Sequence, residues 1–172
     1  LNYPKTILSN LNSIKGKNLL NYPYVLKPRN EGSSVGVAII RNERDKIKYI
    51  SQNKDRNEIL IQEFIEGKEI QVAIYGDNKT GSIEIDPKND FYDYESKYFD
   101  DGQTKHIIPP RITEQQVYFV EKFALDAHNA LGCNGISRTD FILDNKSGNF
   151  YILEVNTQPG MTPTSLVPEI AK

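Results

Sequence analysis

The sequence predicts an α+β protein of two lobes, each with a largely antiparallel sheet flanked by helices. Short apolar runs follow one another directly more often than they alternate with helical segments. That order favours pairing between neighbouring strands over a doubly wound parallel sheet. A length of 172 residues suits one domain or two small lobes. We expect the small lobe to span residues 1–75 and the large lobe to span residues 76–172.

The small lobe contains short apolar runs that end at turn residues, as strands do. We expect strands at Lys5–Leu8, Tyr24–Lys27, Val35–Ile40, Glu58–Gln62 and Glu69–Tyr75. The charged, periodic segment that begins at Arg41 predicts a surface helix ending near Asn53.

The large lobe begins with a predicted strand at Gly81–Ile85 and continues into the polar, tyrosine-rich segment Asp86–Pro110. Irregular segments of this length are often functional lids. Thr113 and Gln116 have the spacing of a capping box and open a helix that Gly132 ends. The apolar stripe expected on this helix consists of Val117, Val120, Phe123, Ala124, Ala127, Ala130 and Leu131.

A β-hairpin is predicted from two alternating runs, Ile136–Asp144 and Phe150–Asn156, joined by the turn-rich segment Asn145–Asn149. If this loop sets the register, Asp144 faces Phe150, Asp140 faces Glu154, and Arg138 faces Asn156. Alternation then puts Arg138, Asp140, Glu154 and Asn156 on one face, and the apolar Phe141, Leu143, Tyr151, Leu153 and Val155 on the other. Carboxylates opposed across strands repel each other unless a cation lies between them. The hairpin therefore predicts a divalent metal site, and a solvated face with an Arg–Asp pair is the alternative.

A lysine precedes a Gly/Ser turn in the segment Lys27–Gly36. Backbone N–H groups of small residues can converge on an anion, and the lysine adds a point charge. Because the turn leads into a predicted strand, it resembles a hairpin flap over phosphates and not a P-loop; a turn without a ligand is the alternative. The following strand and acidic bend, Ile59–Glu69, could hold an adenine, with Glu69 accepting from ribose hydroxyls, or could be an ordinary edge strand.

Composition argues against several classes of partner. A net charge of −2 with scattered Lys and Arg gives no nucleic-acid footprint. No apolar run approaches the roughly 20 residues that span a bilayer, so we expect no membrane partner and a cytoplasmic location. The single cysteine, Cys133, excludes an internal disulfide. Cys133, His106 and His128 are expected to be structural or surface residues.

Several motifs occur in a distinctive order: Lys27 with its flap, the Gln62–Glu69 bend, Phe91–Tyr98, Arg138–Asp140, Glu154–Thr157 and Pro159–Pro168. From about Tyr22 to its end the chain resembles the D-alanine–D-alanine ligases of the ATP-grasp superfamily. The resemblance implies an ATP-grasp fold with ATP between two α+β lobes. It also implies ADP-forming ligation of two D-alanines through an acyl phosphate for peptidoglycan, and a homodimer for the full-length family. A non-catalytic ATP-binding remnant and another ATP-grasp carboxylate–amine ligase are the alternatives.

The same resemblance assigns roles to individual residues. ATP would be bound by Lys27, the flap residues Ser33, Ser34, Val35 and Gly36, the adenine-site residues Gln62, Glu63, Phe64 and Ile65, and Glu69 at the ribose. Mg²⁺ or Mn²⁺ would be bound by Asp140, Glu154 and Asn156, which offer hard oxygen donors. The catalytic residues would be Arg138, Lys97, Tyr98, Ser33 and Gly160. The substrates would also contact Tyr94, Ser165 and Leu166.

The chain also departs from the family pattern. The family has an N-terminal domain before the two lobes and continues beyond the motif that ends at Pro168, so we expect a fragment that lacks the N-terminal domain and is truncated at its C-terminus. Gln62 stands where relatives commonly have glutamate, and its carbonyl oxygen can still accept from an adenine amino group.

Overall fold

The computed structural model describes residues 1–32, 35–54, 56, 58–87 and 104–172. The chain forms two compact units. Among the described residues, the small unit consists of Pro4–Ile65, and the large unit consists of Leu1–Tyr3 and the residues from Glu66 onward. The sequence predicts this division after residue 75, whereas the structure places it between Ile65 and Glu66. The reason is that strand β5 (Gly67–Tyr75) pairs along its length with strands of the large unit.

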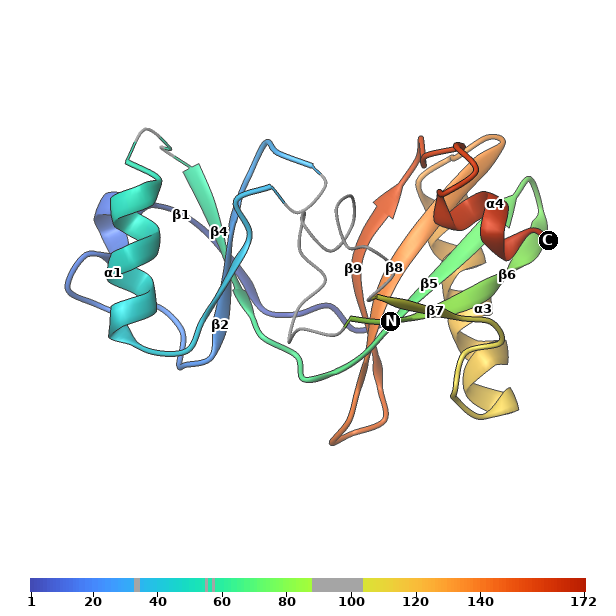
Figure 1. Cartoon of the computed structure of the whole chain (residues 1–172), viewed down its shortest axis with the longest axis horizontal. Helices are drawn as coiled ribbons and strands as arrows, with labels where there is room; N and C mark the ends of the chain where they lie inside the picture. Colours follow the sequence, from blue (N-terminus) through green and yellow to red (C-terminus); the bar gives the residue numbers. More distant parts are fainter. Residues whose placement is uncertain (33–34, 55, 57, 88–103) are drawn as a thin grey trace. The chain divides into compact units, whose positions relative to one another are not determined.

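The small unit is a four-stranded antiparallel sheet with helical segments packed on it (Figure 1). The strand order is β1 (Thr6–Asn10), β4 (Glu58–Glu63), β2 (Tyr24–Pro28) and β3 (Ala38–Ile40), and the helical segments are η1 (Leu11–Ile14) and α1 (Glu43–Gln52). Their shared core contains Leu11, Ile14, Tyr24, Leu26, Ile40, Tyr49, Ile59 and Ile61. The strand predicted from Val35 begins only at Ala38, because Gly36 adopts a turn conformation with a φ of 69°.

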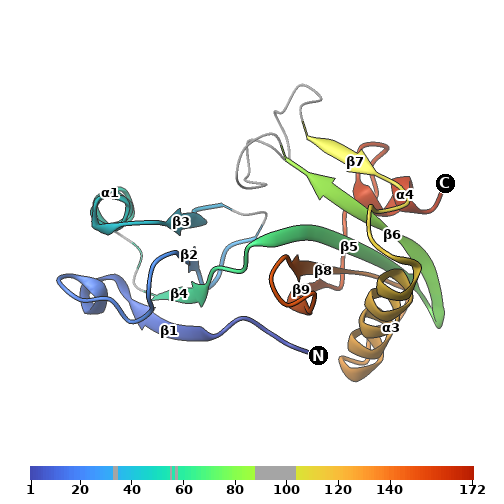
Figure 2. The same cartoon turned by 90° about the horizontal axis from the view of Figure 1, so that it is seen from below.

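The large unit is a five-stranded sheet whose strand pairs are antiparallel, as predicted. The strand order is β7 (Lys105–Ile107), β6 (Asn78–Asp86), β5, β8 (Ile136–Asp144) and β9 (Phe150–Asn156). Helix α3 (Glu114–Ala130) covers one face, and the short helix α4 (Leu166–Ile170) lies on the other (Figure 2). A Cβ added to Gly81 on β6 would lie 3.1 Å from Ile170 Cγ2, so α4 rests closely on that strand.

The α3 face of the sheet holds the core of the large unit. Its buried side chains are Ile70, Val72, Ile74, Val120, Ala124, Phe141, Leu143 and Phe150. The capping box between Thr113 and Gln116 is confirmed. The predicted apolar stripe is wrong at its C-terminal end, where Leu131 is 62% exposed because it is the residue at which the helix ends. The buried position there belongs to His128, whose Nδ1 lies 2.7 Å from the hydroxyl oxygen of buried Ser137.

Strand β9 contains a bulge that changes which of its residues face the core. Leu143 pairs with Phe150, and Phe141 pairs with Ile152, but Asp140 pairs with Glu154, so Leu153 is the extra residue. Phe150 and Ile152 therefore pack in the core on the α3 side. After one extra residue, alternation is reversed, and Glu154 and Asn156 lie on the opposite face.

The bulge corrects two parts of the predicted hairpin. The prediction that Asp144 faces Phe150 is wrong, because Leu143 takes that place. Tyr151 consequently pairs with Ile142 and lies on the face away from α3. The prediction that it shares the apolar core with Phe141 is wrong. A sequence pattern of strict alternation contains no sign of one additional residue.

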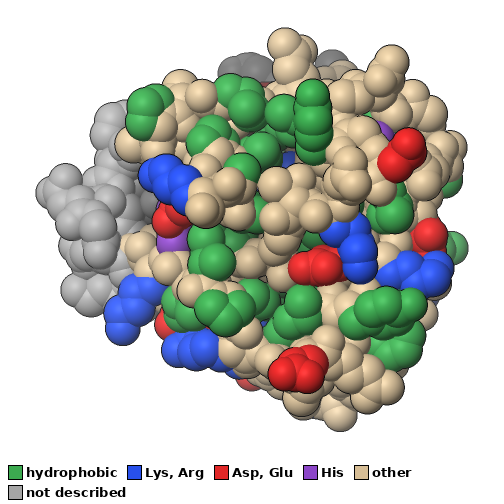
Figure 3. Space-filling model, turned by 90° about the vertical axis from the view of Figure 1, so that its right-hand side faces the viewer, with side chains coloured by type: hydrophobic (Ala, Val, Ile, Leu, Met, Phe, Trp, Pro, Cys, Tyr) green, Lys and Arg blue, Asp and Glu red, His purple; other side chains and the backbone are tan. Residues whose placement is uncertain are grey.

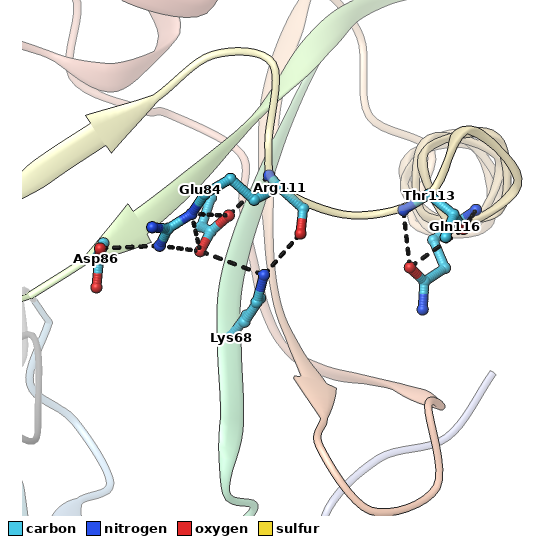
Figure 4. Close-up of polar contacts among 6 residues, drawn as sticks. All are labelled: Lys68, Glu84, Asp86, Arg111, Thr113 and Gln116. Atoms are coloured by element: carbon cyan, nitrogen blue, oxygen red, sulfur yellow. Dashed lines mark hydrogen bonds and ion pairs between the residues drawn. The ribbon is translucent and has the colours of Figure 1, made fainter.

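A buried carboxylate joins β6 to the segment that precedes α3 (Figure 4). Glu84, 2% exposed, accepts from the Arg111 side chain at 2.7 Å and from the Arg111 backbone N–H at 2.8 Å. Lys68 Nζ lies 3.8 Å away, and Asp86 accepts a further bond from Arg111. Burial alone would raise the pKa of Glu84, but the hydrogen bonds and charges of Arg111 and Lys68 outweigh it and lower the pKa. The network thus holds an ionised carboxylate inside the fold.

The outer edge of β9 is covered by the first residues of the chain. Asn2 forms a parallel bridge with Tyr151, and its carbonyl oxygen accepts from the Ile152 N–H at 3.0 Å. Strand β9 is the last strand of the sheet, so this contact uses a backbone N–H that an edge strand otherwise leaves open.

The described surface mixes polar and apolar side chains. On the face shown in Figure 3, acidic and basic side chains lie among hydrophobic ones. Exposed large hydrophobic residues include Tyr75, Tyr118 and Leu131. Within the described ranges, none of the helices has the length and apolar character needed to cross a membrane.

Replacing Glu84 by Gln should lower the free energy of unfolding at pH 7 by about 1.5 kcal/mol, because charge-assisted hydrogen bonds to Arg111 are lost. Glu84 has a pKa below its ordinary 4.5 in the folded state, so the stabilisation is present above pH 4.5 and is lost as the pH falls through the lowered value. The difference between parent and variant in urea unfolding should therefore shrink in acid. Asp126→Asn, which breaks an exposed pair with Lys122, should leave the midpoint unchanged. Equal effects of the two substitutions would contradict this account.

Replacing Gly67 by Ala should destabilise the large unit by about 2 kcal/mol, because an added side chain overpacks a filled space. A Cβ at Gly67 would lie only 2.0 Å from the carbonyl oxygen of Leu143, on the paired strand β8. Gly32→Ala is the matched control, since no atom lies within 4 Å of its added Cβ. Thermal unfolding followed by circular dichroism measures both. A melting temperature of Gly67→Ala equal to that of Gly32→Ala would refute the clash.

Candidate functional site

Polar side chains from β8 and β9 meet on the face of the large unit away from α3. Arg138 pairs with Asn156, and Asp140 pairs with Glu154, which confirms the predicted pairings. Directly opposed residues of an antiparallel pair lie on the same face, with Cβ atoms about 5 Å apart. The four side chains form the group that we call the polar platform: Arg138, Asp140, Glu154 and Asn156.

An ion pair fixes the centre of the polar platform. Arg138 donates from Nε to Asp140 Oδ1 at 2.7 Å and from Nη2 to Asp140 Oδ2 at 2.9 Å. Both side chains are largely buried, with 15% and 6% of their surface exposed. Glu154 is different, because its side chain is 62% exposed and its Oε1 lies 3.9 Å from Arg138 Nη2. The platform therefore joins a fixed guanidinium–carboxylate pair to a second carboxylate that is open to solvent.

The charges around Arg138 keep it protonated. Burial alone would lower the pKa of Arg138, but the hydrogen bonds to Asp140 and the charges of Asp140, Glu154 and Glu69 raise it overall. Because two parallel N–H···O bonds hold the guanidinium plane, its orientation is set by Asp140. Its remaining N–H groups can therefore bind an anion without a change in the conformation of the side chain.

The oxygen donors of the platform suit a hard cation. Asp140 and Glu154 offer carboxylates, and the amide oxygen of Asn156 accepts from the Gln158 N–H at 3.0 Å, which fixes its orientation. An ionised carboxylate has about four lone-pair positions, so Asp140 can bind Arg138 and a cation together. In the part of the chain that the structure describes, no three His, Cys, Asp or Glu side chains gather closely enough to hold a metal ion. Two carboxylates with an amide match Mg²⁺, which usually keeps waters and phosphate oxygens as its other ligands.

Strand β5 adds two polar residues to the same face. Gln71 pairs with Asp140, and Glu69 pairs with Ile142, the residue two positions along β8. The Gln71 side-chain N–H group donates to Glu69 Oε1 at 2.8 Å. Sequence reasoning selected Glu69 and missed Gln71, although a glutamine within the apolar run Ile70–Ile74 was a signal.

The loop after β9 brings two predicted substrate residues together. A Cβ on Gly160 would lie 2.7 Å from Ser165 Oγ, so only glycine allows this approach without displacing the serine. Ser165 Oγ accepts from the Thr162 N–H at 3.1 Å and lies 2.8 Å from the Thr162 hydroxyl. Leu166 is buried at the first position of α4. The loop is thus folded on itself, and its serine hydroxyl lies beside a glycine backbone.

The remaining predicted nucleotide residues lie in the small unit. Lys27 lies on β2, opposite Leu60 of β4, and Gln62 of β4 pairs with Val25 and donates to the Thr6 hydroxyl at 2.9 Å. Glu63 is the last residue of β4, and Phe64 and Ile65 follow it. Lys27 and Gln62 thus lie on adjacent antiparallel strands, each next to the last residue of its strand, whereas Phe64 and Ile65 lie just beyond β4.

The Gly/Ser loop of the small unit is tied down on both sides of its tip. The Tyr49 hydroxyl donates to the Gly36 carbonyl at 2.9 Å, and Arg56 forms an ion pair with Glu31. Burial raises the pKa of Tyr49 to about 12, so the hydroxyl remains a donor at neutral pH. Val35 donates its N–H to the Gly32 carbonyl at 3.1 Å in the turn. Five predicted site residues lie outside the described residues: Ser33, Ser34, Tyr94, Lys97 and Tyr98.

A pocket of about 390 Å³ in the large unit lies apart from these residues. It is lined by the chain start, α3 and the hairpin turn: Leu1, Asn2, Gln115, Gln116, Phe119, Phe123, Gly148, Asn149 and Phe150. No predicted site residue lines it, so the pocket takes no part in the candidate site.

Comparison with known proteins gives one consistent result. The family model described as D-ala D-ala ligase C-terminus matches residues 7–172. The D-alanine--D-alanine ligase of Pelagibacter ubique (strain HTCC1062) is 50% identical over 153 residues, which cover 89% of this chain and 49% of that protein. The corresponding ligase of Geotalea uraniireducens (strain Rf4) is 49% identical over 152 residues, covering 87% of this chain and 48% of the relative.

Solved structures agree with the sequence matches. The Bacillus anthracis D-alanine--D-alanine ligase complexed with ATP has a TM-score of 0.73 at 26% identity, covering 99% of this chain and 54% of that one. The VanG D-Ala:D-Ser ligase from Enterococcus faecalis has a TM-score of 0.81 at 28% identity, covering 99% and 52%. The two antiparallel sheets of this chain thus form the α+β ATP-grasp fold.

The chain spans about half the length of the curated relatives it matches. Within that half, the match runs through both units and includes the polar platform and the Gly160–Leu166 loop. The chain therefore belongs to the D-ala D-ala ligase C-terminus family.

Proposed function

We propose that this chain supplies the nucleotide, metal and second-substrate residues of an ADP-forming ligase that joins two D-alanine molecules for peptidoglycan synthesis in the cytoplasm. The observation that supports it most directly is the polar platform, where a fixed guanidinium lies beside two carboxylates and an amide. Hard oxygen donors next to the buried guanidinium of Arg138 suit phosphoryl transfer, which depends on positioning and electrostatic stabilisation. The family match supplies the substrate class.

The proposed reaction has two steps. One D-alanine carboxylate attacks the γ-phosphate of ATP and forms an acyl phosphate, and ADP leaves. The amine of the second D-alanine then attacks the acyl carbon, and phosphate leaves. Both steps build negative charge, and Arg138, held in one orientation by Asp140, stabilises it on the transferring phosphoryl group and on the carbonyl oxygen.

Asp140, Glu154 and Asn156 are the proposed ligands of Mg²⁺, with Mn²⁺ as a substitute. When bound, the metal ion would neutralise charge on the phosphate oxygens of ATP. The buried Asp140 and the exposed Glu154 have different tasks, since one also orients Arg138 and the other can move to meet a ligand.

The Gly160–Leu166 loop is the proposed site for the second D-alanine. The Gly160 N–H donates to the developing oxyanion, and the Ser165 hydroxyl and the Leu166 N–H bind the substrate carboxylate. The close packing of Ser165 against Gly160 supports this role, because it keeps both groups in one small region. Tyr94, Lys97, Tyr98 and Ser33 retain the substrate and catalytic roles that the resemblance implies.

The small unit contributes the proposed ATP contacts. Lys27 and the flap residues Ser33, Ser34, Val35 and Gly36 bind phosphates, Gln62, Glu63, Phe64 and Ile65 contact the adenine, and Glu69 of the large unit binds the ribose. Ties from Tyr49 and Arg56 to the Gly/Ser loop support a flap whose base is fixed. We also propose that the complete ligase is a homodimer.

Replacing Glu154 by Gln or Asp140 by Asn should weaken Mn²⁺ binding in the presence of ATP by at least about tenfold, because each change removes a charged oxygen ligand. Electron paramagnetic resonance of free Mn²⁺ measures the affinity directly. Glu66→Gln is the matched control, since Glu66 is exposed and pairs only loosely, at 3.9 Å, with Lys146. Chelation by EDTA should release the bound Mn²⁺ signal. Equal Mn²⁺ affinity in Glu154→Gln, Asp140→Asn and Glu66→Gln would exclude this metal site.

Replacing Arg138 by Ala should reduce D-alanine-dependent ADP release by at least about 100-fold while ATP affinity stays within about threefold, since the guanidinium acts mainly on charge developed in the transition state. Arg138→Lys keeps a positive charge near buried Asp140. It therefore separates the loss of the guanidinium from a loss of stability caused by an unpaired buried carboxylate. Lys122→Ala, an exposed change on α3, is the control for a lost surface charge.

The assay uses the chain alone and the chain joined to the part of the Pelagibacter ubique ligase that it does not match. D-Alanine-dependent ADP release in either form, lost in Arg138→Ala, supports the proposal. ATP binding without such release in both forms favours the alternative of a nucleotide-binding module without turnover.

A further inference from the structure

Gln71 is a polar residue within the apolar run Ile70–Ile74. It lies in the middle of β5 and is 0% exposed. Its neighbours across the sheet are Asp140 on β8 and Ile83 on β6, so its side chain lies on the face of the polar platform. The residues on either side of it along the strand, Ile70 and Val72, belong to the core on the α3 face.

Within the described part of the chain, one end of the Gln71 side-chain amide is hydrogen-bonded, and the other is not. Its N–H group donates to Glu69 Oε1 at 2.8 Å. Its carbonyl oxygen is buried and has no hydrogen-bond partner among the described residues. A buried carbonyl without a donor is unfavourable, and an apolar side chain of the same length would avoid that cost. The amide therefore needs a reason other than stability.

One other buried side-chain atom of the described residues lacks a partner, and it provides an internal comparison. This atom is the Thr139 hydroxyl oxygen on β8. Thr139 pairs with Val72, so it lies on the α3 face and away from the platform. Gln71 and Thr139 are thus two fully buried, incompletely bonded residues on neighbouring strands, and they differ in the face that they occupy.

We propose that Gln71 is a positioning residue for nucleotide binding, which orients the Glu69 carboxylate through its amide N–H. The proposal rests on the proposed function, in which Glu69 accepts hydrogen bonds from the ribose hydroxyls. A glutamate side chain has three rotatable bonds, and fixing it before binding removes part of the entropy cost of association. The unpaired carbonyl of Gln71 is the cost of that orientation, as polar residues that weaken a core often mark a site.

The test compares stability with two nucleotides that differ only in their ribose hydroxyls. Melting temperature without ligand, and dissociation constants for ATP and for 2′,3′-dideoxy-ATP with Mg²⁺, are measured by calorimetry. The variants are Gln71→Met, Gln71→Leu and the matched control Thr139→Val. We expect unchanged or higher melting temperatures in all three. ATP binding should weaken about tenfold in the Gln71 variants, the size of one charge-assisted hydrogen bond, with little change for the dideoxy analogue.

Thr139→Val should bind both nucleotides as the parent does. The proposal is overturned if both Gln71 variants melt several degrees lower or fail to fold, because the amide then serves the fold. It is also overturned if they keep the parent's preference for ATP over the dideoxy analogue. If the parent chain itself binds no ATP, the proposed function fails and this inference fails with it. If the parent binds ATP and the Gln71 variants bind equally well, only this inference fails.

Discussion

The extra residue in β9 is the constraint on which the rest of the large unit depends. A strand of strict alternation can serve one face with its even-numbered residues and the other with its odd-numbered ones. Here the even-numbered Phe150 and Ile152 fill the core, and the even-numbered Glu154 and Asn156 serve the opposite face. Only the bulge at Leu153 makes both possible in one strand of seven residues. Core and platform are thus built from consecutive parts of the same strand.

The same sheet keeps a buried carboxylate on each face, and each carboxylate has an arginine. On the α3 face, Glu84 accepts from Arg111 and ties β6 to the start of α3. On the other face, Asp140 accepts from Arg138, two residues before it on the same strand. The first pair joins segments distant in sequence, which is a structural task. The second pair joins near neighbours and adds little to the connection of the fold, so its value lies in the oriented guanidinium.

Sequence patterns predicted much of the fold and the position of the platform, and they failed where one residue changes the pattern. The predicted pairing of Asp140 with Glu154 is correct, although the loop register from which it was predicted is wrong. The one-residue shift at Phe150 and the extra residue Leu153 cancel each other. Alternation cannot reveal such a pair of changes. The division after residue 75 was misplaced because β5 has the pattern of any apolar strand, and one of its two partners, β8, is distant in sequence. The polar side chain of His128 was not part of the predicted apolar stripe. Its burial is explained by the contact with Ser137, which only the three-dimensional structure reveals.

The bridge between Asn2 and β9 has a consequence for how the chain can be divided. Leu1–Tyr3 belong to the large unit, although the next residues belong to the small unit. A recombinant fragment cut at Glu66 to isolate the large unit would lose this cover and leave the Ile152 N–H open at the sheet margin. Such an uncovered margin is a template for intermolecular strand addition, so solubility of the isolated unit would depend on three residues from the far end of the sequence.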